Sequence, residues 1–435
     1  MVSSMTLGKD VFALFRAALE HAEFRKLWFG NLVSGIGSSV TRLALPLAAA
    51  LTLGAGPLDL GLLTAAGTVP NLLFGLPAGV IVDRLPRRLL LIAADVGRAL
   101  LMGSIPAAAL LGVLRMEQLY LVAFLASALD LLFDVGAVSI VPAVLRRAQL
   151  TEGNTLLNLN GQVAKLAGKP LAGFLIAAFT APLVIALDAA SYVVSALCIA
   201  AIGVPELPPG REARAGWRAE IGEGIELVWR DPVLRSIAGA SVLGALAGGA
   251  QASALLLFLA RQLALSSATI GVVLAVSGAV AVPSGLLAKA AAERLGDGRA
   301  IAAGSGLTAL GMLLVPFAGG PALAVLGVLV LSQALVGVGA PIYSINQLTL
   351  RQKAVPDHLQ GRTNATRGFL MSGAAPLGAL AGGYLGEEAG LRAALLGAAL
   401  LMALSLVWLV RSPLWSFRDE ATAGEALAAP GSAST

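Results

Sequence analysis

The sequence predicts an all-α membrane protein in which twelve transmembrane helices form two pseudo-symmetric bundles of six. Of the 435 residues, 57% are hydrophobic and 13% are charged, whereas about a quarter of the residues in soluble domains are charged. The apolar runs are long and continuous, and a helix needs about 20 such residues to cross a bilayer. Since lipid cannot satisfy backbone polar groups and the runs show no two-residue alternation, we expect helices and not barrel strands.

Charge clusters and Gly/Pro turns divide the apolar sequence into spans of membrane length. The six spans expected in the first half cover 27–53, 58–82, 89–113, 117–143, 153–179 and 182–204. The six expected in the second half cover 233–260, 267–292, 299–319, 321–350, 363–386 and 390–411. The predicted domains are therefore a cytoplasmic N-terminus (1–26), a first bundle (27–204), a polar cytoplasmic linker (205–232), a second bundle (233–411) and a disordered cytoplasmic tail (412–435).

The two halves also resemble each other in sequence. VPAVLRRAQLTEGNTL, after the fourth span, is similar to TLRQKAVPDHLQGRTNAT, after the tenth. Such an internal repeat indicates a six-plus-six duplication. Two related bundles with a site between them are a recurring plan of secondary transporters, because rocking one bundle against the other exposes the site to each side in turn.

The basic residues predict the orientation in the membrane. With both termini cytoplasmic, the segments on that side carry about 22 of the 30 lysines and arginines, as the positive-inside rule requires. The opposite side carries Arg115, Arg261 and Arg392. The remaining five fall within predicted spans, where charge is costly and is usually functional or paired. They are Arg42, Arg98, Lys165, Lys169 and Lys289.

Several functional classes lack their required residues. The two histidines, His21 and His358, lie in predicted cytoplasmic segments, so no intramembrane Ser/His pair or metal-binding helix can be assembled. The Gly168-Lys169 pair is followed by Pro170 and not by Ser or Thr, so no phosphate-binding loop is present. We therefore expect neither an enzyme nor a cofactor or metal. The formal charge of +5 is dispersed among the cytoplasmic loops, which argues against nucleic acid as a partner.

The loop between spans two and three carries the most specific motif. It reads Gly79-Val-Ile-Val-Asp83-Arg84-Leu-Pro-Arg87-Arg88. Glycine permits close approach of a neighbouring helix, and an aspartate at a helix end can pair with arginine or with a helix N-terminus. The loop resembles the first signature of the major facilitator superfamily. That resemblance implies a cytoplasmic latch in which Asp83 meets the helix starting near Thr363 in the outward-facing state.

Further segments resemble the drug and siderophore exporters of that superfamily, the group of macrolide efflux proteins and the enterobactin exporter. The matching segments are Phe24–Gly30, Ala44–Leu47, Val82–Arg88 with Asp95, Val141-Pro142 leading to Asn154, and Val355–Arg362. The resemblance covers nearly the whole chain. In span five, however, Lys169 stands where such exporters have proline, so the bend of this helix is expected at Pro170.

Charged residues inside the spans are the candidates for substrate binding or proton coupling. Asp130 and Asp134 share one face of span four, and Lys165 and Lys169 share one face of span five. Their depths predict that Asp134 faces Lys165 and Asp130 faces Lys169, provided that the two helices are neighbours. The pairs then either fix the packing or couple transport to protons, if a carboxylate releases its lysine and binds a proton. Arg42, near mid-depth in span one, is a further candidate for an anionic group.

These observations predict a secondary transporter in the inner membrane of a bacterium. The expected function is proton-coupled export of a hydrophobic or amphiphilic small molecule, such as a drug, a macrolide-like antibiotic or a siderophore. Its expected partners are that substrate, protons and the lipid bilayer, and we expect a monomer. Uptake by the same fold, or a membrane scaffold or sensor without transport, are the alternatives that the sequence leaves open.

Overall fold

The computed structural model describes residues 19–75, 77–203, 226, 228–355 and 357–416. Within the helices, the side chains at positions 80, 83, 148, 357, 358 and 362 are outside this description. Most of the predicted N-terminal segment, linker and tail also lie outside the described residues.

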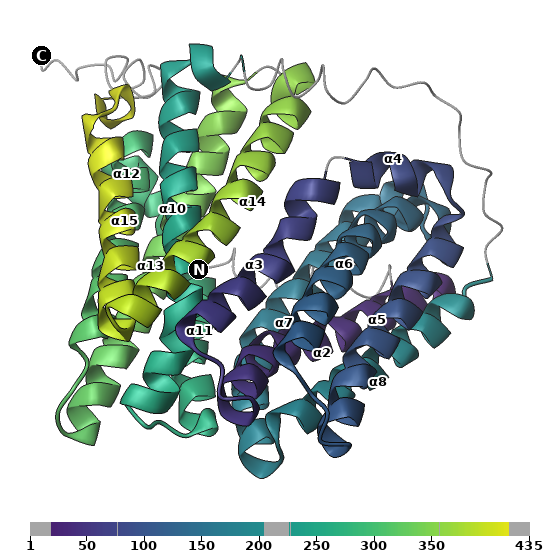
Figure 1. The fold of residues 1–435 in the computed structure, drawn as a ribbon. Coiled ribbons are helices and arrows are strands. Elements are labelled where there is room, and N and C mark those ends of the chain that lie inside the picture. Colours follow the sequence, from purple (N-terminus) through teal and green to yellow (C-terminus); the bar gives the residue numbers. More distant parts are fainter. Residues whose placement is uncertain (1–18, 76, 204–225, 227, 356, 417–435) are drawn as a thin grey trace, which may run out of the picture.

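The first half of the chain forms one bundle of long helices (Figure 1). Its elements are α2 (Ala22–Thr52), α3 (Pro57–Phe74), α4 (Pro77–Arg84), α5 (Arg87–Leu110), α6 (Met116–Val144), the short helix η1 (Arg147–Gln149), α7 (Leu150–Ala178) and α8 (Ala181–Ala200). The predicted second span is divided into α3 and α4. The other five predicted spans of this half each correspond to a single long helix.

The second half forms a second bundle (Figure 1). Its elements are α10 (Pro232–Leu257) with the π-helical turn η2 (Phe258–Gln262), α11 (Ser267–Leu295), α12 (Asp297–Leu314) with η3 (Val315–Phe317), α13 (Ala322–Ala354), α14 (Asp357–Glu388), α15 (Leu391–Arg411) and η4 (Pro413–Ser416). The cap of α10 shows how the sequence sets these boundaries. The Asp231 carboxylate accepts hydrogen bonds from the backbone N–H groups of Val233 (2.7 Å) and Leu234 (3.0 Å), and Pro232 occupies the first helical position.

Nine of the described helices are long and apolar enough to cross a membrane. The three other long helices of the bundles, α3, α7 and α14, are not among the nine. All three meet the opposite bundle, as α10 and α11 also do: α3 packs on α14 and α10, and α7 packs on α11. Part of their surface therefore faces protein and not lipid, which relaxes the need for a fully apolar sequence.

The two bundles touch at one end and diverge at the other (Figure 1). We call the end near Gly203 and Asp231 the linker end, and the end near Thr52 and Leu391 the far end. Toward the far end α7 and α11 approach so closely that a Cβ at Gly173 would lie 2.9 Å from the Cα of Gly271. Only glycine allows that separation.

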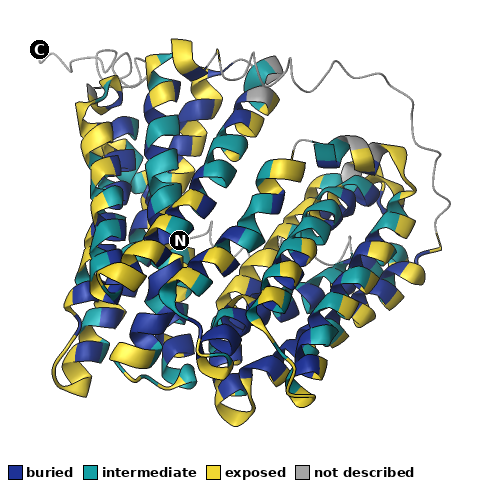
Figure 2. Ribbon diagram, in the orientation of Figure 1, coloured by how far each residue is buried: buried dark blue, intermediate teal, exposed yellow. Residues whose placement is uncertain are grey.

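The hydrophobic core has the same asymmetry, as the distribution of burial in Figure 2 illustrates. One continuous cluster of buried residues crosses both bundles toward the far end, from Leu47 of α2 to Phe258 and Leu391 of the second bundle. Toward the linker end each bundle has its own cluster, around Phe24 in the first and Ile301 in the second. The bundles are thus joined by shared apolar packing at the far end and packed separately at the linker end.

Candidate functional site in the first bundle

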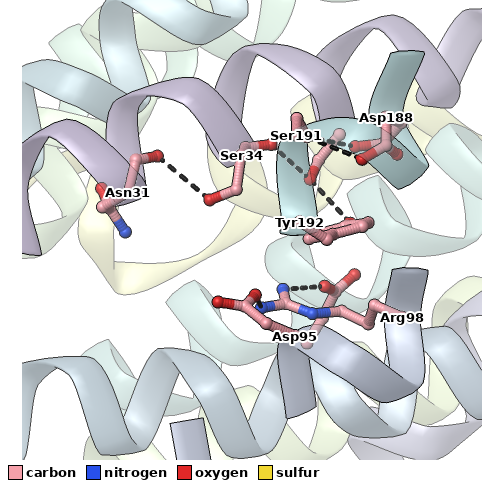
Figure 3. Close-up of polar contacts among 9 residues, drawn as sticks. Asn31, Ser34, Asp95, Arg98, Asp188, Ser191 and Tyr192 are labelled. Carbon is pink, nitrogen blue, oxygen red and sulfur yellow. Dashed lines mark hydrogen bonds and ion pairs between the residues drawn. The ribbon is translucent and has the colours of Figure 1, made fainter. Parts of the chain in front are cut away.

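A buried arginine joins two helices of the first bundle at mid-length. Arg98 forms an ion pair with Asp95, one turn earlier on α5, and a second with Asp130 of α6, where Nη1 lies 2.6 Å from Oδ1 (Figure 3). The Asp95 side chain is fully buried and that of Arg98 is 4% exposed, whereas that of Asp130 is 45% exposed. Asp130 is therefore the member of the cluster that solvent can reach.

Two aromatic rings enclose the same guanidinium. Its Cζ lies 4.2 Å from the ring centroid of Phe133 on α6 and 4.4 Å from that of Tyr192 on α8. A cation held over ring faces in a dry interior gains about 2 kcal/mol or more. The Tyr192 hydroxyl is 2.8 Å from the Ser38 hydroxyl of α2, so the cluster connects four helices of the bundle.

A third buried carboxyl group lies nearby on α8. Asp188 is fully buried, accepts a hydrogen bond from Ser191 at 3.2 Å, and interacts electrostatically with Asp130 and Arg98 (Figure 3). In the described part of the chain, Oδ2 of Asp95 and Oδ2 of Asp188 have no hydrogen-bond partner. Three carboxyl groups around one guanidinium would carry a net charge of −2 if all were ionised. Proton binding would relieve that charge.

The predicted pairing of span four with span five is wrong. Asp130 pairs with Arg98, while Lys169 points to the second bundle, where its Nζ lies 3.5 Å from the carbonyl oxygen of Leu274 on α11. The reason is topological. The long helix α7 packs mainly against α2 and α11, whereas α6 packs mainly against α5 and α3, so consecutive spans are not close neighbours here.

The other predicted charged residues lie on exposed surfaces of the first bundle. Asp134, Lys165 and Arg42 are exposed, and no ion pair of theirs is found among the described residues. Arg42 of α2 is nevertheless close enough to interact electrostatically with both Asp134 of α6 and Lys169 of α7. Arg42 thus lies near two other predicted residues, Asp134 and Lys169. The predicted pairing did not include α2, the helix that carries Arg42.

Three charged residues of the cluster were not named as site candidates from the sequence. Arg98 was noted only as a charge inside a predicted span. Asp95 entered only as part of a family pattern, and Asp188 was not considered. A signal was available for Asp188, because it is the single charged residue of the predicted span 182–204. The involvement of Tyr192 had no signal of its own, since an aromatic residue in an apolar helix is ordinary.

A family model described as transmembrane secretion effector, MFS_3, matches residues 14–432, which is nearly the whole chain. The chain belongs to this family. It is a transporter of the major facilitator superfamily and not an enzyme, as the resemblance of its loop motif predicted. It is a multi-pass membrane protein.

Curated and solved relatives agree with this membership. The chain is 29% identical over 390 residues to the multidrug efflux pump Tap of Mycolicibacterium fortuitum, covering 86% of this chain and 92% of Tap. The nucleoside transporter NupG superposes with a TM-score of 0.72 at 14% identity, covering 91% of this chain and all of NupG. A bacterial homologue of the iron transporter ferroportin, in its inward-facing state, gives 0.71 at 19% identity over 89% of this chain and 99% of its own. The solved structures confirm the predicted fold.

In this family member, the predicted latch residues lie at the linker end of the first bundle. Gly79 and Asp83 belong to α4, and the Asp83 side chain is outside the described residues. The Arg84 side chain is exposed. Arg87 donates to the carbonyl oxygen of Ser139 at 2.8 Å, near the C-terminal end of α6.

Arg88 donates to the carbonyl oxygen of Ala200, the last residue of α8. Cations are favoured at helix C-termini, so Arg87 and Arg88 fix the loop to its own bundle. A Cβ at Gly79 would meet nothing within 4 Å, so the close helix approach expected there is absent from this conformation. The role of the five residues as a latch stays a prediction.

Proposed function

We propose that this transporter exports a hydrophobic or amphiphilic small molecule in exchange for protons, by alternating access of its two bundles. The efflux activity in the name of its relative Tap supports export, and the apolar character of the bundles supports such a substrate. The observation that carries proton coupling is the cluster of Asp95, Arg98 and Asp130, in which one buried guanidinium is shared by two carboxylates.

Asp130 is the proposed proton-binding residue. It is the solvent-accessible member of the cluster, and protonation would cancel its charge and break its ion pair with Arg98. Arg98 would then be held by Asp95 and the two rings alone, which loosens the connection between α5 and α6. A change in the packing of these helices is how proton binding would bias the bundles toward one orientation.

The conformation of the bundles is the one that this mechanism expects after Asp130 has released its proton. By the positive-inside rule we assign the linker end to the cytoplasm, so that the bundles diverge toward the cytoplasm in this structure. An exporter driven by protons releases them on that side, and Asp130 is here ion-paired as a deprotonated residue would be. We further propose that closing the linker end brings Asp83 toward the start of α14, and that the chain works as a monomer.

The test is transport by the purified protein in proteoliposomes with an imposed pH gradient, using a radiolabelled macrolide, the fluorescent cation ethidium and the anionic dye fluorescein. Asp130→Asn should abolish gradient-driven transport while retaining binding. Asp134→Asn, which neutralises the next carboxylate on the same face of α6, should have a smaller effect. Glu293→Gln, an exposed carboxylate of the second bundle, is the matched control and should behave as wild type.

Three outcomes would contradict the proposal. Gradient-driven transport that survives Asp130→Asn would remove Asp130 from proton coupling. Transport of none of the three probes by wild-type protein in proteoliposomes of either orientation would favour a scaffold or sensor. Accumulation in the opposite direction would indicate uptake.

A further inference from the structure

The interior of the second bundle contains arginines but no acidic residues. The sequence has no Asp or Glu at 232–292, 298–356 or 358–386, which covers nearly all of α10, α13 and α14. Two arginines nevertheless lie toward the linker end of these helices: Arg367 is ten residues into α14, and Arg351, in the last turn of α13, is buried. Charge in such positions is costly and usually serves a function.

The two arginines converge on a pair of hydroxyl groups. Nε of Arg367 donates to Oγ of Ser241 on α10 at 3.2 Å, and the same Oγ is 3.0 Å from the hydroxyl of Tyr343 on α13. Tyr343 and Arg351 are eight residues apart and therefore share one face of α13. Arg351 interacts electrostatically with both Arg367 and Tyr343. Three helices thus present two guanidinium groups and two hydroxyl groups to one region.

Neither guanidinium is neutralised in the described part of the chain. Arg351 is 7% exposed, its Nη1 has no hydrogen-bond partner, and neither arginine forms an ion pair with a described carboxylate. Arg98 of the first bundle, equally buried, has two carboxylates and two aromatic rings. A buried, unpaired charge beside a second like charge is strongly unfavourable, so an anionic partner from outside the bundle would stabilise this arrangement.

Arg367 keeps partial exposure in the half of α14 nearer the linker end. On α14, Gly373 is still in contact distance of Leu72 of the first bundle, whereas Arg367 lies one and a half turns closer to the linker end, where the bundles diverge. Arg367 is half-buried and Arg351 is buried. A carboxylate bound at Arg367 would also gain the positive charge of Arg351, which interacts electrostatically with Arg367.

We propose that Arg351 and Arg367, with Tyr343 and Ser241, form a binding site for a carboxylate of the transported molecule, so that the preferred substrate is an acidic amphiphile. This inference rests on the proposed transport function and specifies its substrate class.

The experiment compares binding of two xanthene dyes to the purified transporter by fluorescence anisotropy. Fluorescein carries a free carboxylate, whereas rhodamine 6G has a similar ring system with the carboxylate esterified and a positive charge. Arg351→Gln and Arg367→Gln should each weaken fluorescein binding about tenfold to a hundredfold, the range expected for one charge-assisted hydrogen bond. Rhodamine 6G should bind as before or more tightly.

Two further variants separate the site from general damage. Arg367→Lys keeps the charge and should restore part of the fluorescein affinity. Arg235→Gln removes an arginine of α10 that bonds to the carbonyl oxygen of Trp229 and should leave both dyes unaffected. Thermal stability and size-exclusion profiles establish that each variant is folded.

Three results would overturn the site. They are equal fluorescein binding by all variants, equal loss of both dyes in folded Arg367→Gln, and no fluorescein binding by wild type up to millimolar concentration. Because binding needs no proton gradient, the two proposals fail separately. Charge-selective binding without gradient-driven transport would contradict the transport mechanism and leave the site standing.

Discussion

The two bundles share one architecture but differ in which charged residues lie inside their helices and in how those charges are paired. In the first bundle, Asp95 lies eight residues into α5 and is placed beside Ser195, fourteen residues into α8. In the second bundle, the residue eight positions into α12 is Ser305 and the residue fourteen positions into α15 is Ser405. Their hydroxyl oxygens are 3.5 Å apart. A position that carries a titratable group in one bundle is thus occupied by a neutral hydroxyl in the other.

The difference extends to the cations. Arg98 lies eleven residues into α5, and the position eleven residues into α12 is Thr308, which bonds to the Gly304 carbonyl of its own helix. The first bundle therefore contains buried acids and bases that can exchange partners, whereas Arg351 and Arg367 of the second bundle have no ion-pair partner among the described carboxylates. We interpret this difference to mean that the first bundle binds protons and the second binds the anionic group of the substrate.

The largest effect is expected from breaking the cluster of the first bundle. Arg98→Gln removes the cation that two carboxylates share, and uncompensated buried charge costs about 3–5 kcal/mol. We expect a marked fall in the thermal midpoint of the detergent-solubilised protein and no gradient-driven transport. Thr308→Val, at the same distance into α12, should leave both nearly unchanged. Similar losses in the two variants would contradict the asymmetry between the bundles.

The contact between the bundles provides the next test. Gly173→Val places methyl groups where Gly271 of α11 already lies, so it should force the far end apart and favour the conformation closed at the linker end. Spin labels across the linker end should report shorter distances, and substrate binding from that side should weaken. Gly161→Val on the same helix meets open space and is the matched control. Unchanged distances in Gly173→Val would show that α7 and α11 do not control the conformation.

Removal of one aromatic ring should have a smaller effect. Tyr192→Leu loses the ring that faces the Arg98 guanidinium, which corresponds to about 2 kcal/mol for a dry cation–π contact. Tyr192→Phe keeps the ring and loses only the hydroxyl contact with Ser38, so it should retain more thermal stability than the leucine variant. If the two variants are equally destabilised, the hydroxyl group and not the ring is the stabilising feature.

The smallest effect is expected at Lys289 of α11. The sequence placed this lysine inside a span, but its side chain is 85% exposed and its partner Glu293, 3.7 Å away, is 63% exposed. Exposed pairs of this kind contribute at most about 0.5 kcal/mol. Lys289→Ala should therefore keep wild-type stability and transport rates within twofold. A large loss of transport would indicate that the second bundle contains a charged site beyond Arg351 and Arg367.

Periodicity and composition were sufficient to predict most of the helices. Every predicted span corresponds to a helix whose ends differ by a few residues, with the interruption between α3 and α4 as the exception. These features follow from local physics, because a bilayer requires about 20 apolar residues per crossing and turns require glycine, proline or charge. The same local pattern could not show that α7 packs on α2 and α11 instead of α6.

The sequence by itself determined the membrane class, the long helices and the superfamily motif at Gly79–Arg88, since each depends on residues that are near one another in the chain. It also showed that Asp130 and Lys169 lie inside spans. Only the tertiary structure decided which charges meet. Arg98 reaches Asp130 because α5 packs against α6, and Arg351 and Arg367 converge because α10, α13 and α14 bring Ser241 and Tyr343 together. Electrostatic partners are chosen by distance in space, and helix packing sets that distance.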